Sequence, residues 1–551
     1  MTTDHKTNTM RRTTLLPAIS ISIIIVTGGR LSAQSDTSKL SFNQVEVVKA
    51  FEIKLRETEP VENMPTLGNP DPGLPLYTYT ITPVPVDIQY PKPEIRALAM
   101  LPDDPIDIKK AFFKGGYGNR RSPYGEAAWH TTRKDIYRWG AHGKYFTADD
   151  RERYLNHKLS NIDLDVFGSY VWKNNLQLEG HFTNNYRSRY LWNQNMPEDS
   201  LVVQRNMNRV DAKVGLSNID LSPFKLNYNA EAGFQNTSVS DQGIFEQSFH
   251  VRGEVEKHHT ERLAFVLNLR LETTVYKAEN REALLNALSS PHIIFRIGKF
   301  RSLIGAAAIL SNKNSAVFPK IDLSYPVWQD HIQAFIGSDM KNHNNTMFNL
   351  TAVNPFMNTR VDSLQNTISR EIFGGVRGEY SFISYQFTGG YKLVKNHFQF
   401  FMDSTDIRRH KVSYADGNMI FLTGNLDFKV RKNITAGGRL HGMWFKTDDA
   451  NYLSGIPNLT LNVYSKADFF ENKLKLHAGL LFMDGYRFND FSGREQKENP
   501  LLDLEASVEY FPLSFLGLYI KGNNLLNSNF QRWQGYSQLG IQVSGGLIAT
   551  F

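Results

Sequence analysis

The chain has no cysteine among its 551 residues. Disulfide frameworks, zinc ribbons and cysteine nucleophiles are therefore excluded. Long apolar runs are also missing after residue 33, where the longest is the eight-residue stretch from Leu303 to Leu310. A membrane-spanning helix needs about 20 such residues. The mean hydropathy of −0.39 is too low for a helical membrane bundle, while a hydrophobic content of 41% argues against a disordered chain.

The sequence also lacks the short motifs that mark common catalytic and nucleotide sites. It contains no P-loop, no nucleotide-binding glycine fingerprint, no HExxH and no GxSxG. The formal net charge of +7 is spread along the chain, which does not indicate a basic patch for nucleic acid. We therefore expect no enzymatic activity, no cofactor, no metal site and no nucleic-acid partner.

The first 33 residues have the features of a secretory signal peptide. Lys6, Arg11 and Arg12 form a basic start, an apolar stretch runs from Leu15 to Val26, and small residues lead to Ala33. The apolar stretch is too short to span a bilayer, so we predict cleavage near Ala33. An exported protein without disulfides fits the bacterial envelope better than an animal secretome.

Residues 34–110 form a proline-rich segment. Eleven of the 22 prolines lie between Pro60 and Pro105, so no helix can persist there and extended, partly polyproline II structure is expected. The segment carries 12 acidic and 8 basic residues, and the composition changes near residue 110. We predict a periplasmic collar. It either tethers the domain that follows or enters and caps the lumen of that domain.

From residue 111 to residue 551 the dominant pattern is strict alternation of apolar and polar residues, as in segments 224–234 and 502–510. Such strands have one apolar and one polar face. A soluble sandwich would show the same pattern. However, these strands run about 10–15 residues, whereas soluble strands usually have about five or six. No helical pattern is available to cover an apolar face. The sequence therefore predicts a transmembrane β-barrel with apolar side chains outside and polar side chains inside.

Short turns and long polar loops alternate along this segment, which is typical of transmembrane β-barrels. Ten short turns separate eleven hairpins. This predicts an all-β, antiparallel up-and-down barrel of 22 strands, with both ends of the chain on the periplasmic, short-turn side. The aromatic content of 12% is assigned to girdles at the two membrane interfaces.

The chain ends in an alternating segment that finishes on an aromatic residue, with Leu539, Ile541, Val543, Leu547 and Phe551 on one face. A terminal strand of this kind resembles the sorting signal of bacterial outer-membrane barrels. We predict that it closes the barrel and that the protein resides in the outer membrane. Its expected partners are outer-membrane lipid and, during insertion, the barrel-assembly machinery.

The polar strand faces are expected to line the lumen. Their charges have mixed signs, which favours cross-strand ion pairs over a selectivity ring of one sign. An unobstructed barrel of 22 strands would be a large hole, so the collar, loop 343–369 or a partner must fill it. The candidate lumen-facing residues are Asp163, Asp165, Lys225, Glu231, Arg270, Glu272, Asp503, Glu505 and Glu509.

Two segments resemble a known family. Residues 518–536 resemble the penultimate hairpin of TonB-dependent receptors, in which an Asn-Leu-Leu/Phe-Asn/Asp stretch precedes an aromatic loop. Residues 46–130, with support from residues 354–356, resemble Bacteroidetes outer-membrane barrels that are labelled TonB-dependent receptor-like. The family's globular plug does not fit within residues 34–110, which implies a barrel without a plug. The residues that carry the hairpin match are Asn524, Leu525, Asn527, Phe530 and Tyr536.

Two functions follow from this resemblance and from the polar lumen. The first is a barrel that admits or binds a solute through a lumen obstructed by the collar or by loops. The alternative is an outer-membrane platform without transport, an accessory subunit of an envelope-protein assembly or secretion complex. In that case the proline-rich segment could dock in extended form on a periplasmic or outer-membrane protein partner.

Overall fold

The protein is described from a computed structural model. The structure describes residues 109–131, 136–150, 158–172, 175–197, 201–277, 281–329, 331–361, 363–447, 452–489 and 494–551. The predicted signal peptide and all but the last two residues of the predicted collar lie outside the described residues.

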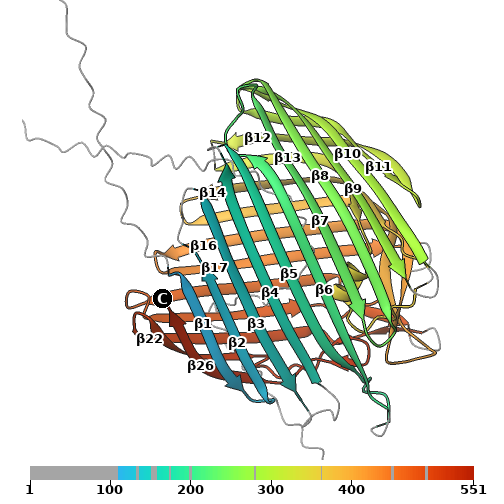
Figure 1. Cartoon of the computed structure of the whole chain (residues 1–551), viewed down its shortest axis with the longest axis vertical. Coiled ribbons are helices and arrows are strands. Elements are labelled where there is room, and N and C mark those ends of the chain that lie inside the picture. The colour runs from blue at the N-terminus through green and yellow to red at the C-terminus, as the bar shows by residue number, and fades with distance from the viewer. Residues whose placement is uncertain are drawn as a thin grey trace, which may run out of the picture. The chain divides into compact units, whose positions relative to one another are not determined.

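Twenty-two strands form one closed antiparallel β-barrel (Figure 1). Each strand pairs with its neighbours along the chain, and β1 (Ala111–Gly118) pairs with β26 (Gln542–Thr550) to close the sheet. The predicted all-β fold and the strand count are confirmed. The other barrel strands are β2 (Ser122–His130), β3 (Tyr137–Asp149), β4 (Lys158–Trp172), β5 (Leu176–Leu191), β6 (Val203–Asn218), β7 (Leu226–Val239), β8 (Ile244–Thr260), β9 (Leu263–Lys277), β10 (Arg281–Ile297), β11 (Phe300–Ser311), β12 (Ser315–Trp328), β13 (Ile332–His343), β14 (Thr367–Tyr380), β15 (Ile383–Met402), β16 (His410–Arg431), β17 (Ile434–Lys446), β18 (Leu459–Phe469), β19 (Leu474–Met483), β22 (Leu501–Leu513) and β23 (Leu516–Asn523).

Three small elements lie in the connections between barrel strands. They are helix α1 (Met347–Val353), the ribbon of β20 (Arg487–Asn489) with β21 (Glu495–Lys497), and the ribbon of β24 (Gln531–Trp533) with β25 (Tyr536–Ser537). Among the described residues, no helix has the length and apolar character needed to cross a membrane.

The outward face of the barrel is apolar. On β9, Leu267, Leu269 and Leu271 are 41–57% exposed, while Tyr276 on the opposite face is only 2% exposed. A soluble protein would bury a continuous row of leucines, whereas a membrane barrel presents such a row to lipid. The polar side chains of the same strand, such as Arg270, point inward. The low mean hydropathy is therefore an average over two opposite faces.

Connections are short at one end of the barrel and longer at the other. Residues 432–433 join β16 to β17, whereas residues 344–366 join β13 to β14. The start of β1 and the C-terminal residue lie at the short-turn end, where the backbones of Ala111 and Phe551 exchange hydrogen bonds of 2.9 and 3.1 Å. The predicted alternation of short turns and long loops is present in the structure.

Aromatic side chains mark the short-turn end on the outward face. Trp172, Trp328 and Tyr380 are the last residues of their strands, and all three are about half exposed. The rings of Trp328 and Tyr380 stack with their centroids 5.7 Å apart. Such rings prefer the headgroup layer of a bilayer, as expected for one of the two girdles.

The closing strand is shorter than the sequence pattern predicts. β26 begins at Gln542, so Leu539 and Ile541 precede it. The Asn119 side chain donates to the Ile541 carbonyl and accepts from Val543 N–H, both at 2.9 Å. Because this amide and Asn524, which donates to the Leu539 carbonyl at 2.9 Å, occupy the backbone groups, the β-ladder starts only after Ile541. Within β26 the side chains of Val543 and Leu547 face outward and are exposed, and so is that of Phe551 just beyond the strand.

A charge on the outward face should destabilise the barrel. We expect Leu269→Arg to lower the free energy of unfolding by about 2–4 kcal/mol, because the guanidinium would enter hydrocarbon. Urea unfolding in lipid vesicles, followed by the mobility shift between folded and unfolded forms on SDS gels, measures the change. The control Asn268→Arg places the same charge on the inward face. An equal loss in both variants would contradict the assignment of the two faces.

Candidate functional site

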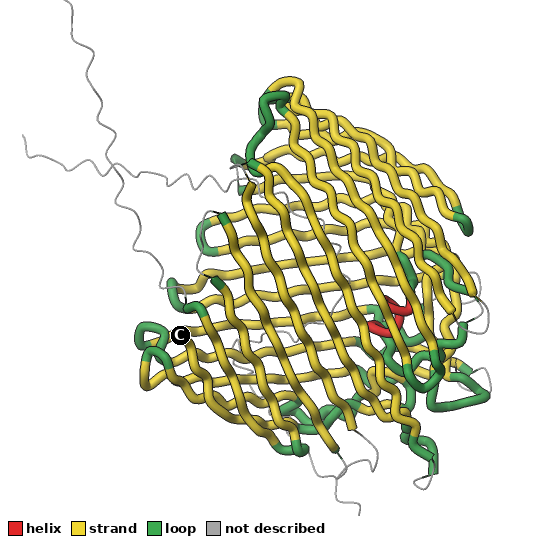
Figure 2. Tube along the Cα trace, in the orientation of Figure 1, coloured by secondary structure: helices red, strands yellow, loops and turns green. Residues whose placement is uncertain are grey.

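Loops at the long-loop end fold back against the inner wall of the barrel (Figure 2). We call this layer the loop cap. Its apolar centre joins Met207 and Tyr276, on β6 and β9, to Phe400 on β15. Since β15 is not a neighbour of β6 or β9 in the closed sheet, this cluster bridges the lumen. The described parts of the loop cap are residues 192–197, 240–243, 344–361, 363–366, 403–409 and 524–541.

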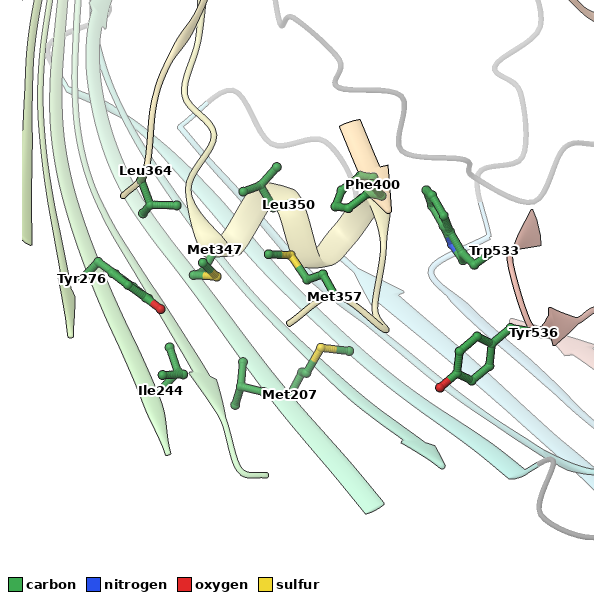
Figure 3. Close-up of a cluster of buried hydrophobic side chains, with 11 residues drawn as sticks. Met207, Ile244, Tyr276, Met347, Leu350, Met357, Leu364, Phe400, Trp533 and Tyr536 are labelled. Carbon is green, nitrogen blue, oxygen red and sulfur yellow. The ribbon is translucent and has the colours of Figure 1, made fainter. Parts of the chain in front are cut away.

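Helix α1 supplies part of the apolar centre. Met347 and Leu350 are almost fully buried and belong to one cluster with Met207, Ile244 and Tyr276 on the barrel wall (Figure 3). Fully burying an apolar side chain of this size stabilises a fold by about 1.5–3 kcal/mol. The centre is completed by Val239, Met357, Leu364, Phe400, Trp533 and Tyr536.

The start of α1 is fixed from the barrel wall. The Glu246 carboxylate on β8 accepts hydrogen bonds from the backbone N–H groups of Met347 at 2.6 Å and Phe348 at 3.0 Å. Thr346 acts as the N-cap residue, because its hydroxyl accepts from Asn349 N–H at 3.3 Å. First-turn N–H groups lack partners inside a helix, and a carboxylate there also meets the positive end of the helix dipole. This contact positions α1 against β8.

Arg205 on β6 is the centre of a hydrogen-bond network that joins three loops of the cap. Its side chain is fully buried and forms a bidentate pair with Asp241, with two N–O distances of 2.8 Å. It also donates to the carbonyls of Pro355 at 2.9 Å and Met357 at 2.6 Å. Asp241 accepts a further bond from Arg409 at 2.9 Å. The β6 wall and three loops of the cap are therefore tied by one charged network.

A second network joins residues 357–359 to residues 403–410. Met357 and His410 form an isolated parallel bridge, flanked by hydrogen bonds of 2.7 and 3.0 Å. The Asn358 amide donates to Asp403 at 3.0 Å. Burial alone would raise the pKa of Asp403, but hydrogen bonds from Thr405, Asn358 and Lys411 lower it to about 2. Asp403 therefore stays ionised at physiological pH and keeps its donors in place.

The residues of the receptor-like hairpin lie together in the cap. Asn524 has a positive φ of 47°, and its amide donates to the carbonyls of Ser528 at 3.1 Å and Leu539 at 2.9 Å. Phe530 is fully buried, and Tyr536 stacks on Phe356 with the ring centroids 3.6 Å apart. Leu525 donates its N–H to Leu504 at 2.9 Å, and Asn527 has a positive φ of 50°.

Most of the sequence-predicted lumen charges sit in ion pairs on the inward face. Lys225 differs: it lies in the turn before β7, with a φ of 54° and its N–H donating to Ser222 at 2.8 Å. The pairs are Asp163 with Arg187, Asp165 with His181, Glu231 with His250 and Arg252, Arg270 with Glu272, Glu505 with Lys521 and Glu509 with Lys114, while Asp503 accepts from Asn524 N–H.

The residues that hold the cap were not among the sequence candidates. Arg205, Asp241 and Glu246 are charged residues in an alternating strand or a polar loop, where nothing distinguishes them from solvated neighbours. Glu246 and Met347 are separated by 101 positions. Only the fold brings them together, although Glu246 does occupy an inward position of the alternation.

No protein-family model matches the chain, and no curated protein matches it in sequence. Solved structures do share its fold. A mutant of the ferric enterobactin receptor PfeA from Pseudomonas aeruginosa matches with a TM-score of 0.61 at 12% identity, covering 80% of each chain. The FrpB iron transporter from Neisseria meningitidis matches with a TM-score of 0.62 at 10% identity, covering 81% of this chain and 82% of its own. The siderophore receptor PirA from Acinetobacter baumannii matches with a TM-score of 0.60 at 10% identity, covering 80% of each chain.

These likenesses show the fold of the chain. Its barrel has the architecture of receptor and transporter barrels, and all three neighbours have names that describe receptors or transporters.

Removing the buried arginine should loosen the cap. We expect Arg205→Met to lower the free energy of unfolding by about 3–5 kcal/mol, because Asp241 would lose its bidentate partner inside the cap. Hydrogen exchange of the backbone amides in 347–358 should then be faster. The control Lys429→Gln breaks a mostly exposed ion pair to Glu379, with an N–O distance of 3.9 Å. It should lower the free energy of unfolding by about 0–1 kcal/mol. Unchanged exchange in Arg205→Met would refute the anchoring role.

Proposed function

We propose that the protein is an outer-membrane receptor-like barrel that admits or binds a solute through its polar lumen, with the loop cap obstructing the extracellular mouth. The observation that carries this proposal is the cap itself, which bridges a lumen lined with ion pairs. The fold shared with the ferric enterobactin receptor and the FrpB iron transporter supports it. A receptor fold without catalytic motifs also supports a function other than catalysis.

We further propose that the chain is a TonB-dependent receptor-like barrel of the Bacteroidetes type without a plug domain. The resemblance of residues 524–536 to the receptor hairpin supports this proposal, because these residues make specific contacts in the cap. In the same proposal, residues 1–33 are a signal peptide and residues 34–110 are a periplasmic collar.

The contacts of the cap suggest how solute entry would work. No disulfide holds the cap, because the chain has no cysteine. Its polar ties converge on Arg205, Glu246 and the pairing of Met357 with His410. A solute that breaks these ties and offers comparable contacts could displace residues 344–366 from the wall. The lumen would then open without any change in the barrel strands.

A disulfide across the cap should block this motion. Paired β-residues lie close enough for a disulfide, which needs a Cα separation of about 4.4–6.8 Å. In the double variant Met357→Cys with His410→Cys, the two new thiols would be the only ones in the chain. We expect the oxidised protein to slow the swelling of liposomes in sugar solutions, and dithiothreitol to restore it.

The two single-cysteine variants are the controls, and neither should respond to dithiothreitol. Equal swelling rates for the oxidised and reduced double variant would show that solutes pass without cap motion. That result would overturn the proposed role of the cap as the obstruction.

Two deletions separate the cap from the collar. Replacing residues 347–364 with a short glycine-serine linker should raise the conductance of the barrel in planar bilayers, because the lumen-bridging cluster would be lost. Deleting residues 60–105 should also raise the conductance if the collar contributes to the obstruction. Unchanged conductance after the second deletion would reject that role for the collar. Unchanged conductance after both, together with a stable protein partner that co-purifies in mild detergent, would favour the platform function.

A further inference from the structure

A small pocket lies between the loop cap and the ends of β4 and β5. Its volume is about 60 Å³, and it is bounded by two cationic and several aromatic side chains. Lys158 and Arg189 supply the positive charges. Tyr190 and Trp192 line the pocket from the β5 side, and the stacked pair of Phe356 and Tyr536 lines it from the cap. None of the described residues around this pocket is an aspartate or a glutamate.

The cationic groups beside the pocket differ in their acidic neighbours, since Lys158 lies opposite Asp149 in the β3–β4 ladder. On β5 and β6, Arg187 pairs with Asp163, and Arg205 pairs with Asp241. Arg189 lies opposite Arg205 in the β-ladder, and its guanidinium donates to the carbonyls of Ser160 at 3.1 Å and Ser188 at 2.8 Å. Within the described part of the chain, no carboxylate lies within ion-pair distance of Arg189.

Arg209, four residues after Arg205 on β6, is a second arginine whose partner is a backbone carbonyl. It faces the same side of β6 as Arg205, and its guanidinium donates to the carbonyl of Phe348 at 3.4 Å. Like Arg189, it has no carboxylate at ion-pair distance among the described residues. Within the described ranges, the wall under the cap therefore presents two guanidinium groups that form no ion pair with a carboxylate.

An unneutralised guanidinium in a half-buried site favours an anionic partner. Withdrawing a charge from water is costly unless an opposite charge and hydrogen bonds replace the water. Arginine has five N–H donors, and two carbonyls leave most of those of Arg189 available. A carboxylate or phosphate can take two of these donors in parallel, which strengthens the bond and fixes its direction.

We infer that this pocket binds the anionic group of the solute, a carboxylate or a phosphate carried on a flat apolar body. A volume of about 60 Å³ has room for the anionic group alone, so the apolar body lies at the mouth of the pocket. The aromatic side chains supply the apolar contact, because rings pack against flat groups in stacked or edge-on geometry. This inference rests on the proposed function and names the class of solute that the barrel takes. Since Phe356 and Tyr536 belong to the cap, a solute in the pocket touches the wall and the cap together.

The test uses the full chain, purified in a non-ionic detergent, and three probes of similar shape: benzoate, phenyl phosphate and neutral benzyl alcohol. Titration calorimetry measures the affinity of each probe. We expect benzoate, phenyl phosphate or both to bind at least about tenfold more tightly than benzyl alcohol, the ratio that one charge-assisted hydrogen bond supplies. The ratio between the two anions distinguishes a carboxylate site from a phosphate site.

Two variants and one control locate the binding. Arg189→Gln and Lys158→Gln should each weaken anion binding about tenfold and leave benzyl alcohol unchanged. The control Lys521→Gln removes a lysine outside the pocket, which pairs with Glu505 at 3.3 Å. It should change neither the affinity for the anions nor that for benzyl alcohol. The SDS-gel mobility shift confirms that each variant is folded.

The outcomes separate the inference from the function on which it rests. If benzyl alcohol binds as tightly as the anions, or if Lys521→Gln loses as much affinity as Arg189→Gln, the anionic class is wrong while solute binding stands. If no probe binds and liposomes containing the protein exclude every solute, both the inference and the proposed function are wrong.

Discussion

The pairing of β1 with β26 is the contact on which the structure depends. Hydrocarbon offers no hydrogen bonds, so each backbone N–H and C=O that faces it must find a partner within the protein. An open sheet of the same 22 strands would have two unpaired edges, whereas the register from Phe112 opposite Thr550 to Gly118 opposite Ser544 removes both. Closure then allows the apolar side chains to face outward. It also creates the lumen that the loops must obstruct.

The loop cap, which we propose as the obstruction of this lumen, is held by a different chemistry from the wall. The wall relies on repetitive backbone pairing, and its inward side chains form local ion pairs between adjacent strands. The cap instead depends on a few specific contacts between distant segments: Glu246 with the start of α1, and Arg205 with Asp241 and two carbonyls. Repetitive pairing tolerates local change, but each cap contact has no substitute. This difference makes the cap the part of the barrel best suited to move.

The sequence was informative wherever structure follows a local rule. The alternation in segment 502–510 predicts the outward side chains of β22, such as Leu502 and Val508, and the ten short turns predict the 22 strands. Prediction was less accurate where side chains compete with the backbone. Asn119 and Asn524 delay the start of β26, and a hydrogen-bonded turn at Ser222 removes Lys225 from β7. The cap could not be predicted, because Arg205 and Glu246 obtain their roles only from partners far along the chain.

The position of Trp533 and Tyr536 has a consequence for assembly. Both belong to the connection between β23 and β26, the last connection between barrel strands along the chain. The apolar centre therefore lacks two of its largest rings until this connection is in place. Helix α1, about 180 residues earlier in the chain, completes its packing only then. The segment that leads into the closing strand thus also supplies the centre of the cap, so closing the wall and completing the cap depend on the same stretch of chain.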